Sequence, residues 1–259
     1  MGAKTVSRRR RVAAISGGSS GIGRATAQAF SRLGWAVAIG ARGAERLAAT
    51  AAELRATGAE VFTRSLDVVD ADSVDTFYGD AEAALGPVDL VVNCAAHAQP
   101  GRLHEREPAA IRAEIETGLI GALLFTRRAL AGMISRHSDG DLAFLSSTSA
   151  VSPWPYLAAY AASKAGIEQA ARSLSLELEG TGVRSVIVRV GNTQGTDWTA
   201  AWTNEELAFA GDWQRFGLLR HVALLRPDRV AEAIVTAVQM PRGVQFDIVS
   251  VQPEAPAGE

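Results

Sequence analysis

The sequence contains a single cysteine, Cys94, and only four histidines among its 259 residues. One thiol cannot form an intrachain disulfide framework, and this usage is compatible with a reducing cytoplasm, where we expect the protein to reside. The histidines lack metal-ligand spacing, so we expect no metal site. A large excess of charge of one sign is also lacking, because the sequence has 26 Lys and Arg and 28 Asp and Glu. Without a basic excess, nucleic acid is not expected as a partner.

Long apolar runs are lacking as well. No run approaches the roughly 20 residues of a membrane-spanning helix, so no membrane partner is expected. The short apolar run at 12–15, which follows four arginines, is too short for a signal peptide, whose apolar region needs about 7–15 residues. We expect residues 1–10 to form a flexible tail that leads into a strand, and residues 251–259 to form a second flexible tail.

Short β-branched runs alternate with longer alanine-rich segments of helical period through most of the chain. This alternation is typical of an α/β protein whose parallel sheet carries helices on both faces. The runs are apolar without strict alternation, as expected of strands buried on both faces. We therefore predict a doubly wound parallel sheet of about seven strands. The expected strands are 12–16, 36–40, 60–64, 88–93, 141–146, 183–190 and 244–249, and the expected helices are 21–33, 43–57, 70–85, 108–137, 157–180 and 228–239.

No linker, internal repeat or low-complexity block divides the chain. We therefore predict a single domain over residues 11–250. Residues 192–225 interrupt the alternation of strands and helices and are rich in tryptophan and polar residues. An insertion of this length at the carboxyl edge of a sheet is commonly a lid or substrate loop, and we interpret it as a substrate lid.

The first expected strand runs into the sequence S-G-G-S-S-G-I-G, with Gly17, Gly21 and Gly23 at the turn. Glycines let the backbone turn sharply and approach a pyrophosphate, whose charge the free N–H groups at a helix start can bind. A tight turn alone would also need only small residues, but strand, turn and helix occur here in the order of a dinucleotide site. Arg42, at the end of the second strand, can bind a 2′-phosphate and favours NADP(H) over NAD(H); a solvated arginine at a helix start is the alternative.

Tyr160 and Lys164 lie four residues apart in the sequence Y-A-A-S-K, so their side chains project from one helix face. Ser147 ends a strand 13 positions before the tyrosine, and a loop can bring the two hydroxyls together. This set suits carbonyl reduction: the phenol donates a proton, the serine polarises the carbonyl oxygen, and the lysine ammonium is expected to lower the phenol pKa. A helix-surface pair is the alternative for an isolated Y-x-x-x-K.

Taken together with the glycine loop, these residues resemble the classical short-chain dehydrogenase/reductase family over about residues 10–250. Further matching pieces are D-V at 67–68, N-C-A-A at 93–96 and the glycine Gly191. The resemblance implies a Rossmann fold, a dimer or tetramer of identical chains and a small-molecule substrate. It also implies catalytic roles for Ser147, Tyr160 and Lys164. The cofactor-binding residues that it implies, together with those argued above, are Ser16, Gly17, Ser19, Ser20, Gly21, Ile22, Gly23, Arg42, Asp67, Val68, Asn93, Ala95, Tyr160, Lys164, Gly191, Thr193 and Thr196.

Some positions depart from the family pattern. Gly118 stands where the family has a catalytic asparagine that binds a water of a proton relay, and Val190 stands in place of a proline. Cys94 replaces an asparagine, and we interpret it as a buried apolar residue rather than a nucleophile. Gly118 motivates a second hypothesis, a catalytically weak NADP(H)-binding sensor or scaffold. A third hypothesis is a dehydratase or epimerase that uses the same tyrosine.

Aromatic residues gather on the expected substrate side. Trp154 follows the serine strand, and Trp198 and Trp202 lie four residues apart in the insertion, so they could share a helix face. We expect these three, with His97, to line the substrate site and to favour an apolar or aromatic carbonyl compound. The alternative is that the rings cover the core or an interface between subunits. The leading hypothesis is an NADP(H)-dependent oxidoreductase that interconverts a ketone and a secondary alcohol.

Overall fold

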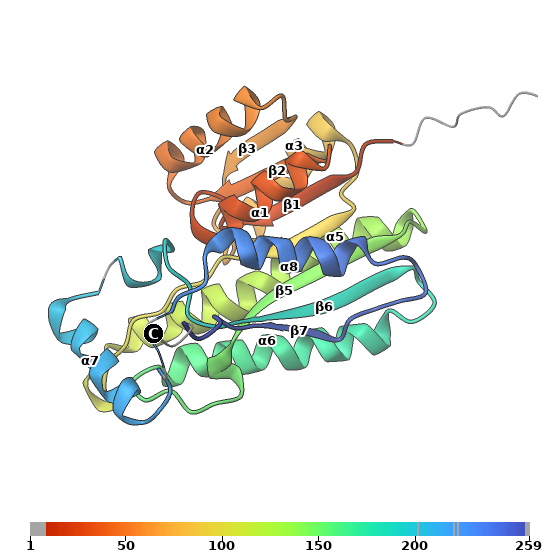
Figure 1. The fold of residues 1–259 in the computed structure, drawn as a ribbon. Coiled ribbons are helices and arrows are strands. Elements are labelled where there is room, and N and C mark those ends of the chain that lie inside the picture. Colours follow the sequence, from red (N-terminus) through yellow and green to blue (C-terminus); the bar gives the residue numbers. More distant parts are fainter. Residues whose placement is uncertain (1–8, 201, 220, 222, 257–259) are drawn as a thin grey trace, which may run out of the picture.

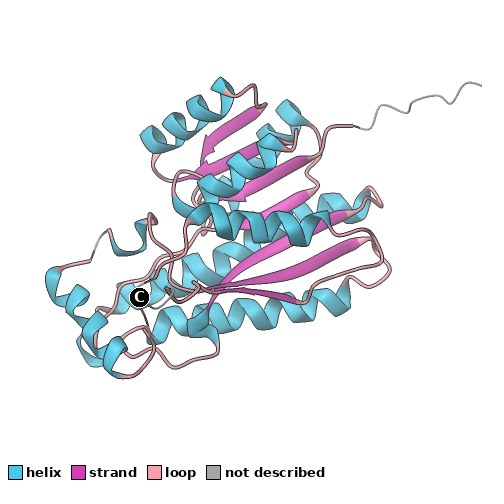
Figure 2. Ribbon diagram, viewed as in Figure 1, coloured by secondary structure: helices cyan, strands magenta, loops and turns pink. Residues whose placement is uncertain are grey.

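The strands form one parallel sheet (Figure 1; Figure 2) in the computed structural model, which describes residues 9–200, 202–219, 221 and 223–256. The strand order is β3-β2-β1-β4-β5-β6-β7. The chain adds strands on one side of β1 up to β3 and on the other side from β4 onward, as in a Rossmann fold. The prediction of a doubly wound sheet of about seven strands is confirmed. The strands are β1 Val12–Ser16, β2 Ala36–Ala41, β3 Val61–Ser65, β4 Leu90–Asn93, β5 Gly140–Ser147, β6 Val183–Val190 and β7 Ile248–Val251.

Helices cover both faces of the sheet, and each face has its own core cluster. On one face, Phe77 and Phe125 belong to a cluster of aromatic and aliphatic side chains; on the other, Phe30 and Ile234 are fully buried. All five residues of β1 are buried, because this strand lies between two others and under both layers. One layer contains α1 Gly21–Arg32, α2 Ala44–Ala56 and α8 Pro227–Gln239, and the other contains α3 Ala71–Leu85, α5 Gly121–Ser135 and α6 Ala158–Glu177.

The predicted bounds agree with the structure to within two residues for most elements. The helix α6 ends at Glu177, three residues before the predicted end at 180. The larger difference is in the last strand, because β7 begins at Ile248 rather than at 244. The guanidinium of Arg184 explains this shift: its donors bind the carbonyls of Val238, Met240 and Val244, which holds this stretch as a loop. The strand then ends at Val251, the first residue of the predicted carboxyl-terminal tail.

The lid region contains a helix that the sequence analysis missed, α7 Asn204–Arg215. Its signal is a capping box. The Thr203 hydroxyl accepts a hydrogen bond from the Glu206 backbone N–H at 3.2 Å, and the Glu206 carboxylate accepts one from the Thr203 N–H at 2.6 Å. The T-x-x-E spacing is visible in the sequence, so this helix start could have been predicted.

The stretch Pro108–Ser135 is one continuous helical segment, in which α4 Pro108–Ile115 passes through a π-helical turn at Glu116–Ile120 into α5. By length and composition alone this segment could cross a membrane, which corrects the expectation that no segment approaches that length. The core helix of a soluble domain meets the same two criteria. Phe125, Ala129 and Met133 of this segment are buried in the core against the sheet.

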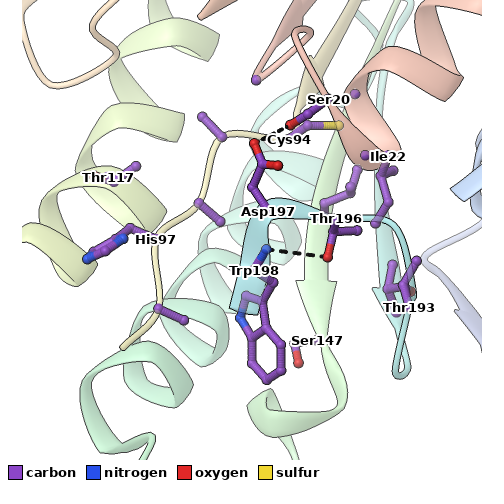
Figure 3. A pocket seen from close by; sticks show the side chains of 18 of the residues that line it. Ser20, Ile22, Cys94, His97, Thr117, Ser147, Thr193, Thr196, Asp197 and Trp198 are labelled. Atoms are coloured by element: carbon purple, nitrogen blue, oxygen red, sulfur yellow. Dashed lines mark hydrogen bonds between the residues drawn. The ribbon is translucent and has the colours of Figure 1, made fainter. Parts of the chain in front are cut away.

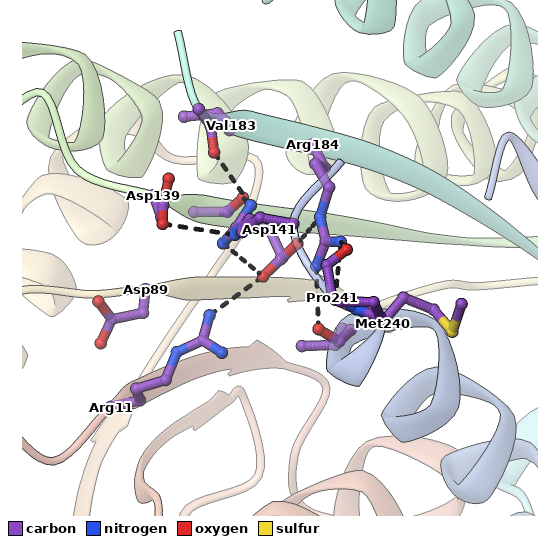
Figure 4. Close-up of polar contacts among 12 residues, drawn as sticks. Arg11, Asp89, Asp139, Asp141, Val183, Arg184, Met240 and Pro241 are labelled. Atoms are coloured by element: carbon purple, nitrogen blue, oxygen red, sulfur yellow. Dashed lines mark hydrogen bonds and ion pairs between the residues drawn. The ribbon is translucent and has the colours of Figure 1, made fainter. Parts of the chain in front are cut away.

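The amino-terminal edge of the sheet is held by ion pairs (Figure 4). Asp141, at the start of β5, is 3% exposed and accepts from Arg184 at 2.8 Å, Arg11 at 3.1 Å and Arg242 at 3.3 Å. Asp89 pairs with Arg9 at 2.5 Å and accepts from the Val12 backbone N–H at 2.8 Å. Residues 9 and 10 of the predicted amino-terminal tail are thus in contact with the domain, since Arg10 also pairs with Glu60. Residues 1–8 of that tail, and 257–259 of the other, lie outside the described residues.

The carboxyl-terminal edge is open and lies beside the lid region. Here the Gly191 backbone N–H, just after β6, donates to the Val251 carbonyl at 2.8 Å. The chain after β7 therefore leaves the sheet next to Gly191. A Cβ atom at Gly191 would lie 2.4 Å from the side-chain oxygen of Gln252, so a larger residue here would require the Gln252 side chain to move.

Candidate active site

A cavity of about 590 Å³ opens at the carboxyl edge of the sheet (Figure 3). Loops that follow the strands β1 to β6 line it, together with the amino-terminal part of α6. It lies where the strand order reverses, the place at which doubly wound sheets bind their ligands. Sequence segments from residue 17 to residue 200 thus meet in one site.

The glycine loop after β1 forms one wall. Gly17 and Gly21 have φ angles of +68° and +50°, a conformation that side chains rarely adopt. At Gly23 a Cβ atom would lie 2.2 Å from the Gly17 carbonyl oxygen, so the helix start can pack this closely only with glycine. These positions form a backbone cradle at the start of α1 of the kind that fits a dinucleotide pyrophosphate. The other predicted loop residues on the cavity wall are Ser19, Ser20 and Ile22.

The far end of the cavity is lined by Asp67 and Val68, which follow β3, and by Arg42, which follows β2. All three were predicted as cofactor contacts. A second arginine, Arg46, lies in the first turn of α2 and lines the same cavity. The sequence analysis missed it, although its spacing of four residues from Arg42 was visible. Two guanidinium groups at this end can hold a phosphate monoester.

The predicted catalytic residues meet on one wall of the cavity. Ser147 ends β5, and its hydroxyl accepts a hydrogen bond from the Ser149 backbone N–H at 3.2 Å. Tyr160 and Lys164 project from the first turns of α6 and are 8% and 4% exposed. The Lys164 ammonium lies 5.7 Å from the Tyr160 ring centroid and donates to the Leu145 carbonyl at 2.8 Å. The strand end, the loop and the helix therefore bring the three side chains together as predicted.

Burial dominates the acid–base chemistry of this wall. It raises the pKa of Tyr160 to about 12, while hydrogen bonding with Ser147 lowers this pKa in part and the charge of Glu114 raises it. Burial also lowers the pKa of Lys164 to about 8. The lysine ammonium was expected to lower the tyrosine pKa. This expectation is wrong for the protein alone, in which burial raises the pKa of Tyr160. The phenol is a protonated group over the whole neutral range, suited to donate a proton.

An ionic frame lies directly behind this wall. Glu168, one helical turn after Lys164, is 2% exposed and accepts from Arg189 of β6 at 2.7 and 2.8 Å. The hydroxyl of Ser146, next to Ser147, donates to the same carboxylate at 2.7 Å. This carboxylate therefore ties α6 to β5 and β6 at the level of the catalytic groups. The charge of Arg189 and these hydrogen bonds lower the pKa of Glu168 despite its burial.

Three predicted site residues do not line the cavity. The Ser16 hydroxyl accepts from the backbone N–H groups of Cys94 and Ala95 at 3.2 and 3.3 Å, so it braces the loop after β4 from behind. The Asn93 side chain donates to the Thr126 hydroxyl at 2.9 Å and is buried. Trp202 packs behind Trp198. These placements correct the predicted direct contacts, because all three side chains point into the structure that supports the cavity. Ala95, Gly191, Thr193 and Thr196 do line it.

Gly118 lies in the π-helical turn between α4 and α5 and is buried. A Cβ atom at this position would lie 2.7 Å from the Ser163 hydroxyl oxygen. Ser163, in the Y-A-A-S-K sequence, donates to the Tyr160 carbonyl at 2.7 Å. The serine hydroxyl thus occupies the space into which an asparagine side chain would extend. The absence of a side chain at Gly118 is therefore matched by the Ser163 hydroxyl of α6, which fills this space.

The predicted substrate side contains a cluster of tryptophans. Trp154, Trp198 and His97 line the cavity, as predicted. The Trp198 ring lies 6.0 Å from Tyr160 and 4.5 Å from Trp202, between centroids. The Trp202 indole N–H donates to the Ala98 carbonyl at 2.9 Å, which anchors the lid to the loop after β4. The rings therefore serve both alternatives: some face the cavity, and others form a small core that holds the lid.

Cys94 also lines the cavity (Figure 3). Burial raises the pKa of its thiol to about 12, and the charge of Lys164 lowers it in part. A thiol with this pKa stays protonated at neutral pH and is a poor nucleophile. Cys94 is half-buried rather than buried as expected, but its protonated thiol agrees with the interpretation that it is not a nucleophile.

Comparison with known proteins agrees with this geometry. The model of the family described as short chain dehydrogenase matches residues 11–207. A short chain dehydrogenase of Pseudocercospora fijiensis is 39% identical over 71% of this chain and 60% of its own length. A cis-4-hydroxycyclohexanecarboxylate dehydrogenase of Sinomonas cyclohexanicum is 35% identical over 86% of this chain and 87% of its own length. Several relatives are longer, and this chain spans 19–60% of their length.

The fold comparison leads to the same family. An alcohol dehydrogenase from the archaeon Thermococcus sibiricus, complexed with 5-hydroxy-NADP, superposes with a TM-score of 0.81 at 28% identity. The match covers 96% of this chain and 99% of that chain. With the sheet order, the glycine loop and the Ser147, Tyr160 and Lys164 wall described above, these matches identify this chain as a member of the short-chain dehydrogenase/reductase family of oxidoreductases.

Proposed function

We propose that this protein is an NADP(H)-dependent oxidoreductase that interconverts a ketone and a secondary alcohol. The observation that carries the proposal is one continuous cavity, in which the glycine loop and the arginines Arg42 and Arg46 lie at one end and Ser147, Tyr160 and Lys164 form a wall. A nicotinamide dinucleotide bound there would supply or accept the hydride. The positive φ angles of the loop glycines support the fit, because a side chain at these positions would be strained.

Each catalytic side chain has a distinct task in this proposal. The Ser147 hydroxyl orients and polarises the substrate oxygen. The Tyr160 hydroxyl, protonated at neutral pH, donates a proton to that oxygen in the reductive direction. Lys164, nine-tenths buried and charged below a pH of about 8, binds ribose hydroxyls and keeps a positive charge beside the phenol. The reverse oxidation would use the phenolate as a base, and a pKa of about 12 keeps this form scarce at neutral pH.

The substrate is proposed to be an apolar or aromatic carbonyl compound. Trp154, Leu157 and Trp198 line the substrate end of the cavity and are apolar over most of their surface. His97 and Thr117 add polar groups at the same end. A flat apolar wall with a few polar groups is typical of sites for small organic molecules.

The test is a panel of ketones and aldehydes assayed with NADPH and, separately, with NADH. We expect NADPH consumption with aromatic or alicyclic ketones, and slower consumption with NADH because the arginines have no 2′-phosphate to bind. Equal rates with both cofactors would contradict the preference. Binding of NADPH without consumption for any carbonyl compound would favour the second candidate, a sensor. This candidate is motivated by Gly118, which stands where the family has a catalytic asparagine.

We further propose that the protein is a cytoplasmic dimer or tetramer of identical chains. Apolar side chains on the outer surface of the α5 and α6 layer support an interface, because Ile134 is 38% and Leu176 is 71% exposed. Light scattering after size-exclusion chromatography measures the mass. A charged residue in place of Leu176 is expected to give a monomer, and a wild-type monomer would contradict this proposal.

A further inference from the structure

The lid places an acidic side chain on the cofactor side of the cavity. Asp197 directly follows Thr196 and begins the short helix Asp197–Thr199. Its carboxylate accepts a hydrogen bond from the Ser20 hydroxyl at 2.9 Å (Figure 3). The same carboxylate forms an ion pair with the Arg46 guanidinium. All three residues line the cavity. A lid carboxylate therefore joins the phosphate loop to the first turn of α2.

The two partners of Asp197 make up a subsite for an anion. A hydroxyl and a guanidinium are groups with which proteins bind phosphate. The side chains of Arg46 and Asp197 are 60% and 46% exposed, so the Arg46 guanidinium can exchange the Asp197 carboxylate for an anion from solution. Arg42, four residues before Arg46, lines the same part of the cavity. A phosphate monoester recognised by Arg42 would draw on Arg46 and Ser20 as well.

We propose that the Asp197 carboxylate occupies the subsite for the 2′-phosphate of NADP(H), and that the two anions compete for Ser20 and Arg46. This inference rests on the proposed function. NADP(H) displaces the carboxylate when it binds, because two anions cannot share one guanidinium and one hydroxyl without repulsion. NAD(H) carries no 2′-phosphate and leaves the contact in place. The lid residue thereby lowers the affinity for NADP(H) and weakens the discrimination between the two cofactors.

The direct test is Asp197→Asn, with NADPH and NADH titrated separately and the dissociation constants measured by cofactor fluorescence. Removal of the charge is expected to tighten NADPH binding by up to about fivefold, which is the upper end for a partly exposed charge pair. The affinity for NADH is expected to change far less. Glu205→Gln is the matched control, because it removes the same charge from an exposed position of the same lid, in the first turn of α7.

A second variant tests whether the effect passes through Arg46. Arg46→Gln is expected to weaken NADPH binding severalfold and NADH binding little. In the double variant, Asp197→Asn is expected to give no further gain, because the shared guanidinium is gone. Arg55→Gln, an exposed arginine in the last turn of the same helix, is the matched control.

Two results would overturn the inference while the proposed function stands. The first is weaker NADPH binding in Asp197→Asn, which would mean that the carboxylate holds the lid over the bound cofactor. The second is an equal change, or none, for both cofactors in a wild-type background that binds them. Wild-type protein that binds neither cofactor would overturn the proposed function and the inference together.

Discussion

The two edges of the sheet, at the amino-terminal and the carboxyl-terminal ends of its strands, differ in how their buried charged groups are paired. At the amino-terminal edge, the carboxylates of Asp89 and Asp141 are 6% and 3% exposed, and arginines bind both (Figure 4). At the carboxyl-terminal edge, Tyr160 and Lys164 are as deeply buried, but they face a cavity. Lys164 donates there to a backbone carbonyl rather than to a carboxylate.

This difference indicates that the amino-terminal edge stabilises the fold, whereas the carboxyl-terminal edge contains the reacting groups. The carboxylates of Asp89 and Asp141 bind arginines and a backbone N–H from neighbouring strands, so these contacts hold β1, β4, β5 and β6 together at the amino-terminal edge. A buried phenol and a buried ammonium without such partners have shifted pKa values and respond to pH and to ligands. The following predictions test this division, from the largest expected effect to the smallest.

The largest effect is expected from Tyr160→Phe. Loss of the proton donor should lower kcat for NADPH-dependent reduction by about 10²–10⁴-fold, the usual contribution of a general acid. NADPH affinity and the melting temperature should stay near those of the wild type, because only a hydroxyl is removed from the cavity wall. Tyr156→Phe is the matched control, since its hydroxyl binds Asp212 in the lid. Retained turnover in Tyr160→Phe would contradict the assigned role.

The second prediction addresses the opposite edge. Asp141→Ala should lower the free energy of unfolding by about 3 kcal/mol, the low end for breaking a buried ion pair, because it leaves the guanidinium of Arg184, whose side chain is 13% exposed, without its carboxylate. Chemical denaturation measures this loss. Turnover per folded molecule should be unchanged. Asp139→Ala is the control: this side chain is 65% exposed and lies 3.5 Å from Arg242, so its removal should cost at most about 1 kcal/mol.

The third prediction concerns pH. Lys164 has a pKa lowered to about 8, so it is charged below this pH and loses its proton above it. Tyr160, with a pKa of about 12, stays protonated over the same range. The reductive kcat/KM should therefore fall above pH 8, approaching about tenfold for each further pH unit. A profile that stays flat to pH 10, in protein shown to be folded by circular dichroism, would contradict it.

The smallest effect is expected at the π-helical turn. Gly118→Ala brings a methyl group against the Ser163 hydroxyl and should lower the free energy of unfolding by about 1 kcal/mol, the low end for overpacking. Adding Ser163→Ala should restore it, because the clash is removed. Thermal unfolding of the single and double variants measures the coupling. Additive losses would show that the two side chains do not share this space.

Much of the fold could be predicted from the sequence, because buried parallel strands and amphipathic helices have strong patterns. The strands β1 and β6 have the predicted bounds. The error at β7 has a long-range cause: the apolar run at 244 is β-like, but the Arg184 guanidinium, 60 residues earlier, binds its carbonyl. The helix α7 has a weak apolar pattern, since Trp213 is the residue that it buries, and its start is marked by the capping box at Thr203.

The catalytic wall could be predicted because its residues follow local rules, a strand end and a helical spacing of four. Contacts between distant segments could not be predicted. Asp197 meets Ser20 and Arg46 across more than 150 residues of sequence. The inward direction of Asn93 and Trp202 depends on partners, Thr126 and the Ala98 carbonyl, that only the packed structure supplies.

The hydrogen bond from the Gly191 N–H to the Val251 carbonyl has a practical consequence for anyone who attaches a tag or a second domain. A fusion after Val251 starts beside the mouth of the cavity, whereas a fusion before Arg9 starts at the opposite edge of the sheet, next to Asp89. An affinity handle on the first side would crowd Gly191 and the lid. One on the second side would leave the reacting groups accessible, so immobilisation through the amino-terminal side is the geometry that keeps this protein usable on a surface.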